Sequence, residues 1–189
     1  MKISNNDISD LINYLYPINR SITGKGNILS LKAIKKLVPI KIRKFKSGEK
    51  VYDWVIPDEW NISEAWIKDL NGNKIIDFKE NNLHVVGYSK SVNKVINYKD
   101  LVKKLHSLPN QKNAIPYVTS YYKRDWGFCC TENFKKKLDK KGKYKVFIDS
   151  NFKKAGKLNY GEIYFPGKQN EEILFVTNIC HPSLANNEL

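Results

Sequence analysis

The residue spacing changes near Ser47-Gly48, and this change restricts the fold more than any other feature of the sequence. Before it, apolar residues recur at helical spacing over residues 7–16 and 27–37, and a proline closely follows each stretch. After it come short β-like runs, two of which are separated by the turn-forming pair Asn71-Gly72. These runs cover residues 51–56, 62–70, 74–78 and 84–88. The pattern predicts two helices followed by a β-rich module.

Three tryptophans, Trp54, Trp60 and Trp66, fall within this β-rich stretch. We expect at least two of them to belong to an aromatic cluster inside the module. A short helix is predicted after them, over residues 98–105, because its apolar residues share one face.

A third region begins near Thr131, which is expected to cap a helix over residues 132–138. Three strands are predicted beyond this helix, at residues 144–148, 158–165 and 173–179. Pro166-Gly167 predicts a hairpin connection between the last two, and the last strand is expected to be buried in a sheet separate from that of residues 51–56. The overall expectation is a mixed α+β fold.

The chain is strongly basic, with 33 Lys and Arg residues against 19 Asp and Glu residues and a net charge of +14. Just three of the basic residues are arginines, the residue type that reads guanine and phosphate through bidentate contacts. We therefore interpret the excess charge as solvated surface lysine and expect no nucleic-acid partner.

Features of membrane and secreted proteins are not evident. The longest apolar run, residues 173–176, is far shorter than a membrane span, and the N-terminus turns polar at once. The three cysteines, Cys129, Cys130 and Cys180, form neither a disulfide framework nor a Cys-x-x-Cys pair. They are interpreted as small buried hydrophobic residues, and a reducing cytoplasm is the expected location.

The segment with the clearest chemical potential is residues 172–183, in which the predicted apolar strand is followed directly by His181. Ligands collect at the carboxyl ends of strands in open α/β sheets, and histidine is a good zinc ligand. A single histidine at a strand end is nevertheless more often structural. His84 and His106 have no partners at ligand spacing and are expected to serve ordinary surface or packing roles.

Several ordered motifs resemble the aminopeptidase-like family of bacterial proteins, and the resemblance covers essentially the whole chain. The first is Tyr16-Pro17-Ile18-Asn19-Arg20-Ser21-Ile22-Thr23-Gly24. Those that follow are Val51-Tyr52-Asp53-Trp54, Pro57-Asp58-Glu59-Trp60-Asn61-Ile62, Asn82-Leu83-His84-Val85-Val86-Gly87-Tyr88-Ser89, Ile115-Pro116-Tyr117-Val118-Thr119-Ser120-Tyr121-Tyr122, Trp126-Gly127-Phe128-Cys129, Tyr160-Gly161-Glu162 and Cys180-His181-Pro182-Ser183-Leu184-Ala185-Asn186-Asn187-Glu188-Leu189.

The resemblance implies the incomplete α/β sandwich of a zinc exopeptidase, built from residues 1–46 and 131–189. An inserted β-rich domain, residues 47–130, is expected to interrupt it. By the same resemblance, His181 matches the first metal-binding histidine of the di-zinc aminopeptidases. Asn187 takes the place of their bridging aspartate, and Glu188 lies beside it.

Asparagine is a neutral and poorer bridging ligand, and the remaining ligands and the general base of such enzymes are expected beyond Leu189. The chain is therefore interpreted as the N-terminal part of a longer zinc-dependent hydrolase, inactive alone, because a catalytic zinc needs three protein ligands. Its unpaired apolar edge favours self-association.

Three functions stay open. The parent protein is expected to cleave an N-terminal peptide bond or a related amide, with zinc polarising the carbonyl and activating water. A second possibility is action on a modified sugar amide in surface-polysaccharide biosynthesis, which the resemblance suggests. A third is a binding or regulatory protein on the same scaffold with a vestigial metal site, which Asn187 favours.

The charge interpretation is testable by a salt titration with duplex DNA. We expect weak binding that disappears near physiological salt, because lysines scattered over several faces cannot converge on one groove. Fluorescence anisotropy with a labelled duplex measures this, and submicromolar, sequence-selective binding at physiological salt would contradict it.

Overall fold

The computed structural model describes residues 3–184, and within them it shows a mixed α+β fold, as expected. The chain divides into two compact units. Unit 1 comprises Met1–Glu59 and Lys153–Leu189, and unit 2 comprises Trp60–Phe152. The chain therefore leaves unit 1 once and returns to it once.

Two helices open unit 1, and both lie close to their predicted limits. Helix α1 spans Asn5–Leu15 and begins at a capping box, in which Ser4 Oγ accepts a hydrogen bond from Asp7 N (3.2 Å) and Asp7 Oδ2 accepts one from Ser4 N (2.8 Å). Helix α2 spans Lys25–Leu37 and follows Gly24, whose φ of +94° is accessible mainly to glycine.

The strands of unit 1 form two small sheets. Strand β1 (Lys41–Lys46) pairs antiparallel with β10 (Lys157–Glu162), and β2 (Lys50–Val51) pairs with β3 (Trp54–Val55). Helix α2 packs closely on β10, because a Cβ at Gly161 would lie 3.0 Å from Leu31 Cδ2. Leu15, Leu31, Ile40 and Ile56 supply buried apolar side chains.

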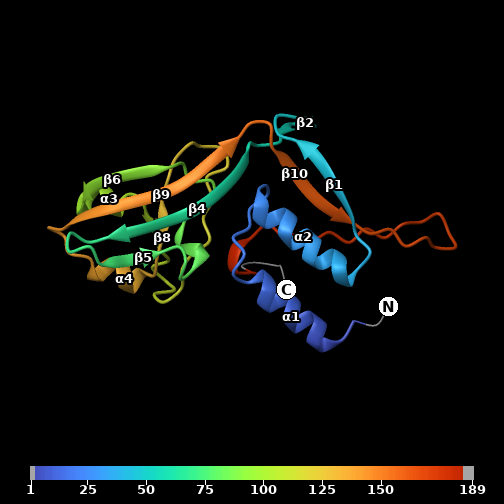
Figure 1. Ribbon diagram of the computed structural model, residues 1–189, viewed down its shortest axis with the longest axis horizontal. Coiled ribbons are helices and arrows are strands. Elements are labelled where there is room, and N and C mark those ends of the chain that lie inside the picture. Colours follow the sequence, from blue (N-terminus) through green and yellow to red (C-terminus); the bar gives the residue numbers. More distant parts are fainter. Residues whose placement is uncertain (1–2, 185–189) are drawn as a thin grey trace. The chain divides into compact units, whose positions relative to one another are not determined.

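Unit 2 is built on a four-stranded sheet in the order β5-β4-β9-β6. The strands are β4 (Glu59–Lys68), β5 (Lys74–Asp77), β6 (Val92–Asn97) and β9 (Lys143–Lys153). Central strands β4 and β9 run in opposite directions (Figure 1) and each continues into unit 1 at its outer end. The same pair of strands therefore carries the chain into unit 2 and out of it.

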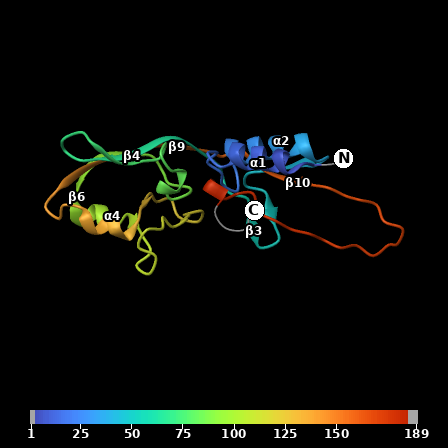
Figure 2. The same cartoon turned by 90° about the horizontal axis from the view of Figure 1, so that it is seen from below.

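The remaining elements of unit 2 contribute residues that pack against one face of this sheet. They are the 3₁₀ turn η1 (Asn82–His84), α3 (Tyr98–Val102), β7 (Leu105–His106), β8 (Phe128–Cys129) and α4 (Glu132–Lys137). Figure 2 shows α4 to one side of β4. The shared core consists of Ala65, Ile67, Ile76, Val85, Leu101, Leu105, Trp126, Phe128, Cys130, Leu138, Tyr144, Val146 and Ile148. As predicted, Thr131 caps α4, with its Oγ1 accepting from Phe134 N at 3.0 Å.

Two of the three tryptophans of the β-rich stretch contribute to aromatic pairs in unit 2. Trp60 is buried and stacks on Tyr88 with ring centroids 5.5 Å apart, whereas Trp66 stacks on Phe147 at 5.0 Å. Trp54 lies on β3 in unit 1.

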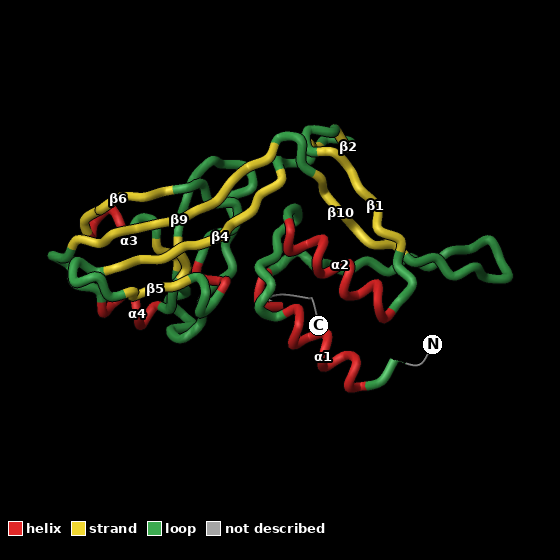
Figure 3. Tube along the Cα trace, in the orientation of Figure 1, coloured by secondary structure: helices red, strands yellow, loops and turns green. Residues whose placement is uncertain are grey.

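The expected strand at residues 173–179 is wrong, and so is its expected hairpin with the preceding strand. Residues 163–181 carry no helix or strand, and Figure 3 shows this stretch as a loop leaving β10. Ile173, Leu174, Phe175 and Val176 are 84%, 85%, 90% and 80% exposed. A strand exists through hydrogen bonds to a neighbour, and no strand pairs with this run in residues 3–184.

The compact units also divide the chain at different positions from the expected limits of 47 and 130. Residues 143–152 belong to unit 2 because β9 pairs with β6 there, with Val92 opposite Ile148. Residues 47–59, including the β2–β3 hairpin, belong to unit 1. Spacing predicts strand 144–148 and, at residues 62–70, its neighbour β4, but it does not predict the other neighbour, β6.

None of the helices formed by residues 3–184 combines the length and the apolar character needed to cross a bilayer.

The one-sided core of unit 2 predicts very different effects for the same substitution on neighbouring strands. Val146 on β9 is fully buried, whereas Val95 on β6 is 54% exposed. We expect Val146→Ala to lower the free energy of unfolding by about 2 kcal/mol, from lost burial and the cavity left behind. The matched control, Val95→Ala, should cost no more than about 1 kcal/mol. Urea unfolding followed by tryptophan fluorescence measures both, and equal losses would contradict the assignment of the faces.

Candidate functional site

His181 lies at the end of the extended stretch that follows β10, where the chain turns into the short 3₁₀ turn η2 (Pro182–Leu184). It is half-buried, and Pro182 beside it is buried. Proline restricts the backbone of the residue before it to extended conformations. Ser183 has a φ of +53°, in the left-handed region. The backbone around His181 is therefore bent sharply at a defined place.

Arg20 holds the backbone at this place. Its side chain is buried, and its Nε and Nη2 both donate to the carbonyl oxygen of His181, at 3.0 and 2.7 Å. Its Nη1 donates to the carbonyl oxygen of Leu15, the last residue of α1, at 2.8 Å. Residues 161 positions apart in the chain thus meet at the candidate ligand.

The described donors around His181 do not amount to a zinc site. Cys180 Sγ lies 3.8 Å from His181 Nδ1, and across residues 3–184 there is no group of three or more His, Cys, Asp or Glu side chains able to hold a metal ion. Asn187 and Glu188, the other expected ligands, lie outside the described residues. A zinc site needs three or four donors, so the described residues alone do not fit the ion.

The cysteines of unit 2 have no nucleophilic character. Cys129 and Cys130 are buried, as predicted, whereas Cys180 of unit 1 is half-buried. Burial raises the pKa of Cys129 to about 12 and that of Cys130 to about 11. Both thiols therefore stay protonated at neutral pH. His84 also has a packing role, because its Nδ1 lies 2.8 Å from the carbonyl oxygen of Cys129.

A second candidate site lies on the sheet face of unit 2 opposite the core. Trp66 on β4 and Phe147 on β9 stack there with an interplanar angle of 21°. Two lysines flank the pair: Lys68 Nζ lies 4.7 Å and Lys145 Nζ 5.9 Å from the centroid of the Trp66 ring. Val95, which pairs with Lys145 on this face, is 54% exposed. The aromatic pair therefore borders solvent rather than the core.

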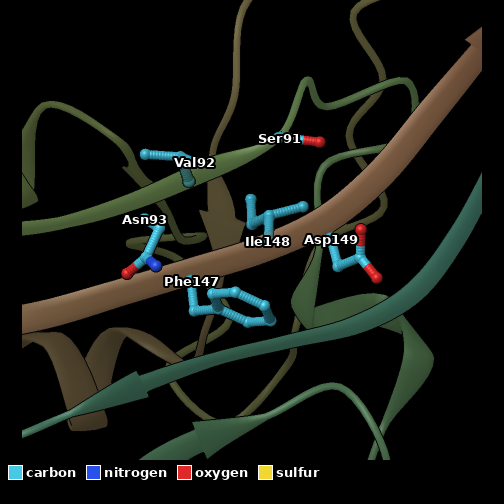
Figure 4. A pocket seen from close by; sticks show the side chains of 6 residues that line it. All are labelled: Ser91, Val92, Asn93, Phe147, Ile148 and Asp149. Carbon is cyan, nitrogen blue, oxygen red and sulfur yellow. The ribbon is translucent and has the colours of Figure 1, made fainter.

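A small hollow adjoins the aromatic pair. Figure 4 shows it between β6 and β9, with Asn93 and Phe147 near each other and Asp149 further along β9. Its volume is about 230 Å³, and Ser91, Val92 and Ile148 complete the lining. Asp149 accepts a hydrogen bond from Ser63 Oγ on β4. The hollow thus combines an aromatic ring, an amide and a carboxylate, which suits a ligand with both apolar faces and hydroxyl groups.

Sequence reasoning found His181 but assigned no role to Arg20 or to the Trp66–Phe147 pair. A signal for Arg20 existed, because it is one of three arginines in a chain that otherwise uses lysine. The partnership of Trp66 and Phe147 depends on strands 81 positions apart, so no local pattern could have indicated it.

Comparisons with known proteins agree with this two-part organisation. Residues 59–151, almost exactly unit 2, match the family described as "Domain of unknown function (DUF2172)". Over 184 residues the chain is 48% identical to a Clostridium acetobutylicum protein named "Putative polysaccharide biosynthesis protein with aminopeptidase-like domain". That alignment covers 97% of this chain and 42% of the relative.

The chain is also similar to a crystal structure of a "putative peptidase" from Clostridium acetobutylicum, with 48% identity and a TM-score of 0.88. The match covers 96% of this chain and 42% of that one. The chain thus spans less than half the length of the relatives it matches. Its similarity lies with DUF2172 in unit 2 and with an aminopeptidase-like protein along almost all of its length.

Proposed function

We propose that this chain is part of an aminopeptidase-like hydrolase of amide bonds and that its 189 residues do not by themselves form the catalytic metal site. The observation that carries the proposal is the setting of His181. A half-buried histidine stands at a sharp bend whose backbone is fixed by Arg20, in a region similar to an aminopeptidase-like protein. Contacts that orient the ligand are a common feature around metal-binding histidines.

The donor count supports the second half of the proposal. His181 offers one good nitrogen ligand, whereas organised zinc binding depends on three or four donors acting together. In longer proteins similar to this chain, further residues are available to complete such a site, because the chain corresponds to 42% of their length.

Zinc titration tests the proposal directly. We expect calorimetry of the 189-residue chain to show no nanomolar zinc site, and aminoacyl-anilide substrates to be hydrolysed no faster than without protein, because one firm ligand cannot organise the ion. His181→Ala should leave both results unchanged.

The control is His84→Ala, which removes a histidine engaged with the Cys129 carbonyl in unit 2. Nanomolar zinc affinity that is lost in His181→Ala but kept in His84→Ala would contradict the proposal, as would turnover that a chelator abolishes.

We propose as a second function that the open sheet face of unit 2 binds a neutral saccharide. The stacked pair of Trp66 and Phe147 carries this proposal, because large aromatic rings at the solvent border of a sheet commonly mark a binding surface. The apolar C–H faces of sugar rings stack on such rings. The amide of Asn93 and the carboxylate of Asp149 can bond the hydroxyl groups.

The charge on this face favours a neutral ligand over a nucleic acid. Lys68 and Lys145 are offset by the carboxylate of Asp149, which lines the hollow beside Phe147. Carboxylates accept hydrogen bonds from hydroxyl groups but repel phosphates. The name of the Clostridium acetobutylicum relative, which mentions polysaccharide biosynthesis, is consistent with a saccharide ligand.

A test uses cellohexaose and chitohexaose as probes and tryptophan fluorescence and NMR shifts as readouts. We expect binding near millimolar strength, about 4 kcal/mol, as suits a small, open site. Trp66→Ala should abolish it, and Phe147→Leu should weaken it while preserving an apolar side chain in the sheet.

The matched control is Trp54→Ala, which removes a tryptophan from unit 1 and should leave binding unchanged. Equal binding by wild type and a folded Trp66→Ala protein would contradict the proposal. Binding of single-stranded polyuridylate but of neither oligosaccharide would contradict it as well.

A further inference from the structure

We infer that Arg20 is a positioning residue that fixes the backbone and thereby the side-chain direction of His181. The role for His181 as a metal ligand rests on the proposed function, but the positioning itself does not. The inference follows from one buried guanidinium that contacts two backbone carbonyls from distant parts of unit 1.

The geometry of the contact sets a direction as well as a distance. Nε and Nη2 of Arg20 converge on one acceptor, the His181 carbonyl oxygen, at 3.0 and 2.7 Å, while Nη1 reaches the Leu15 carbonyl oxygen at 2.8 Å. The guanidinium is planar and rigid, so the three bonds hold both carbonyls in a fixed relation to each other. Its positive charge also suits the C-terminal end of α1.

The loop that carries Arg20 is itself held in place on both sides. Thr23 forms a β-bridge with Leu158 on β10, and Ser21 Oγ donates to the Thr23 carbonyl oxygen at 2.6 Å. At the start of α2, a Cβ on Gly26 would lie 1.9 Å from the Asn19 carbonyl oxygen, so the helix packs directly against the peptide before Arg20. The backbone that carries the Arg20 side chain is therefore held in place by β10 and α2.

The His181 side of the contact has little freedom left. The proline ring fixes φ at Pro182, and Arg20 holds the carbonyl between these two residues. On the N-terminal side of His181, the Sγ atom of Cys180 lies 3.8 Å from the Nδ1 atom of the imidazole. With the carbonyl held, the backbone that carries the His181 side chain is restricted on its C-terminal side.

Lysine cannot reproduce this arrangement, because an ammonium is a compact charge that lacks the planar fork. We therefore expect a graded response: Arg20→Gln loses the positioning, and Arg20→Lys restores part of it. Arg43→Gln is the matched control. Arg43 also belongs to unit 1 and also makes a two-donor contact, but with the exposed Glu162 carboxylate.

Two measurements on the metal-free 189-residue chain test the inference. The chain has three histidines, so the imidazole Cε1–H signals are resolvable by NMR and are assigned with His181→Ala. In Arg20→Gln we expect the His181 signal to move while the His84 and His106 signals stay. Hydrogen exchange of the amides at residues 180, 181, 183 and 184 should rise about tenfold or more, as expected for losing hydrogen bonds from a charged donor. Arg20→Lys should fall between wild type and Arg20→Gln.

An unchanged His181 signal and unchanged exchange in Arg20→Gln would overturn the inference, as would an equal effect of Arg43→Gln. If Arg20→Gln does not fold, the same two measurements are made on Arg20→Lys. The wild-type chain is then also examined for the NMR scalar coupling between Arg20 Nε and the His181 carbonyl carbon, which is transmitted through the hydrogen bond. Absence of that coupling would also overturn it. None of these measurements needs a metal, so a negative result contradicts the positioning role and leaves the proposed function untouched. The proposed function is contradicted instead by nanomolar zinc binding or by turnover.

Discussion

The antiparallel pairing of β4 with β9 is the constraint on which the rest of the structure depends. These strands lie at the centre of the unit 2 sheet, and they are also the two places where the chain passes between the units. Their inward side chains, such as Ala65, Ile67, Val146 and Ile148, are almost completely buried. Because the strands are neighbours, the two separated segments of unit 1 begin and end close to each other, at Glu59 and Lys153.

The two segments of unit 1 contact each other where they lie close together. The Glu59 carboxylate accepts a hydrogen bond from Lys157 N at 3.1 Å, and Gly156 approaches Glu59 so closely that a Cβ there would lie 2.1 Å from Glu59 Cβ. The same unit contains the pairing of β1 with β10 and the contact between Arg20 and His181. The segment around His181 is thus joined to the first helices through contacts within unit 1.

Local signals in the sequence were sufficient where the structure is locally determined. Thr131 and the apolar spacing of the first two helices act over three or four residues, and these helices lie close to their expected limits. Strand β6 is not indicated by the sequence, because residues 92–97 do not alternate between polar and apolar side chains; the strand is defined by its pairing with β9. The apolar run Ile173–Val176 was predicted as a buried strand because hydrophobicity indicates burial, yet in the described residues the run has no strand to pair with. Arg20 was missed for a related reason, since its partner lies 161 positions away.

Native-state hydrogen exchange of the intact chain in increasing urea tests the central role of the β4–β9 pair most directly. Unit 2 has a continuous core, whereas unit 1 has few buried apolar side chains and exposes Ile173–Val176. We expect the amides of β4 and β9 to exchange only when the whole of unit 2 opens, with the largest opening free energy in the chain. Amides of α1, α2 and β10 should exchange through smaller openings. Opening free energies for the amides of β4 and β9 that are smaller than those of unit 1 would contradict the central role of this strand pair.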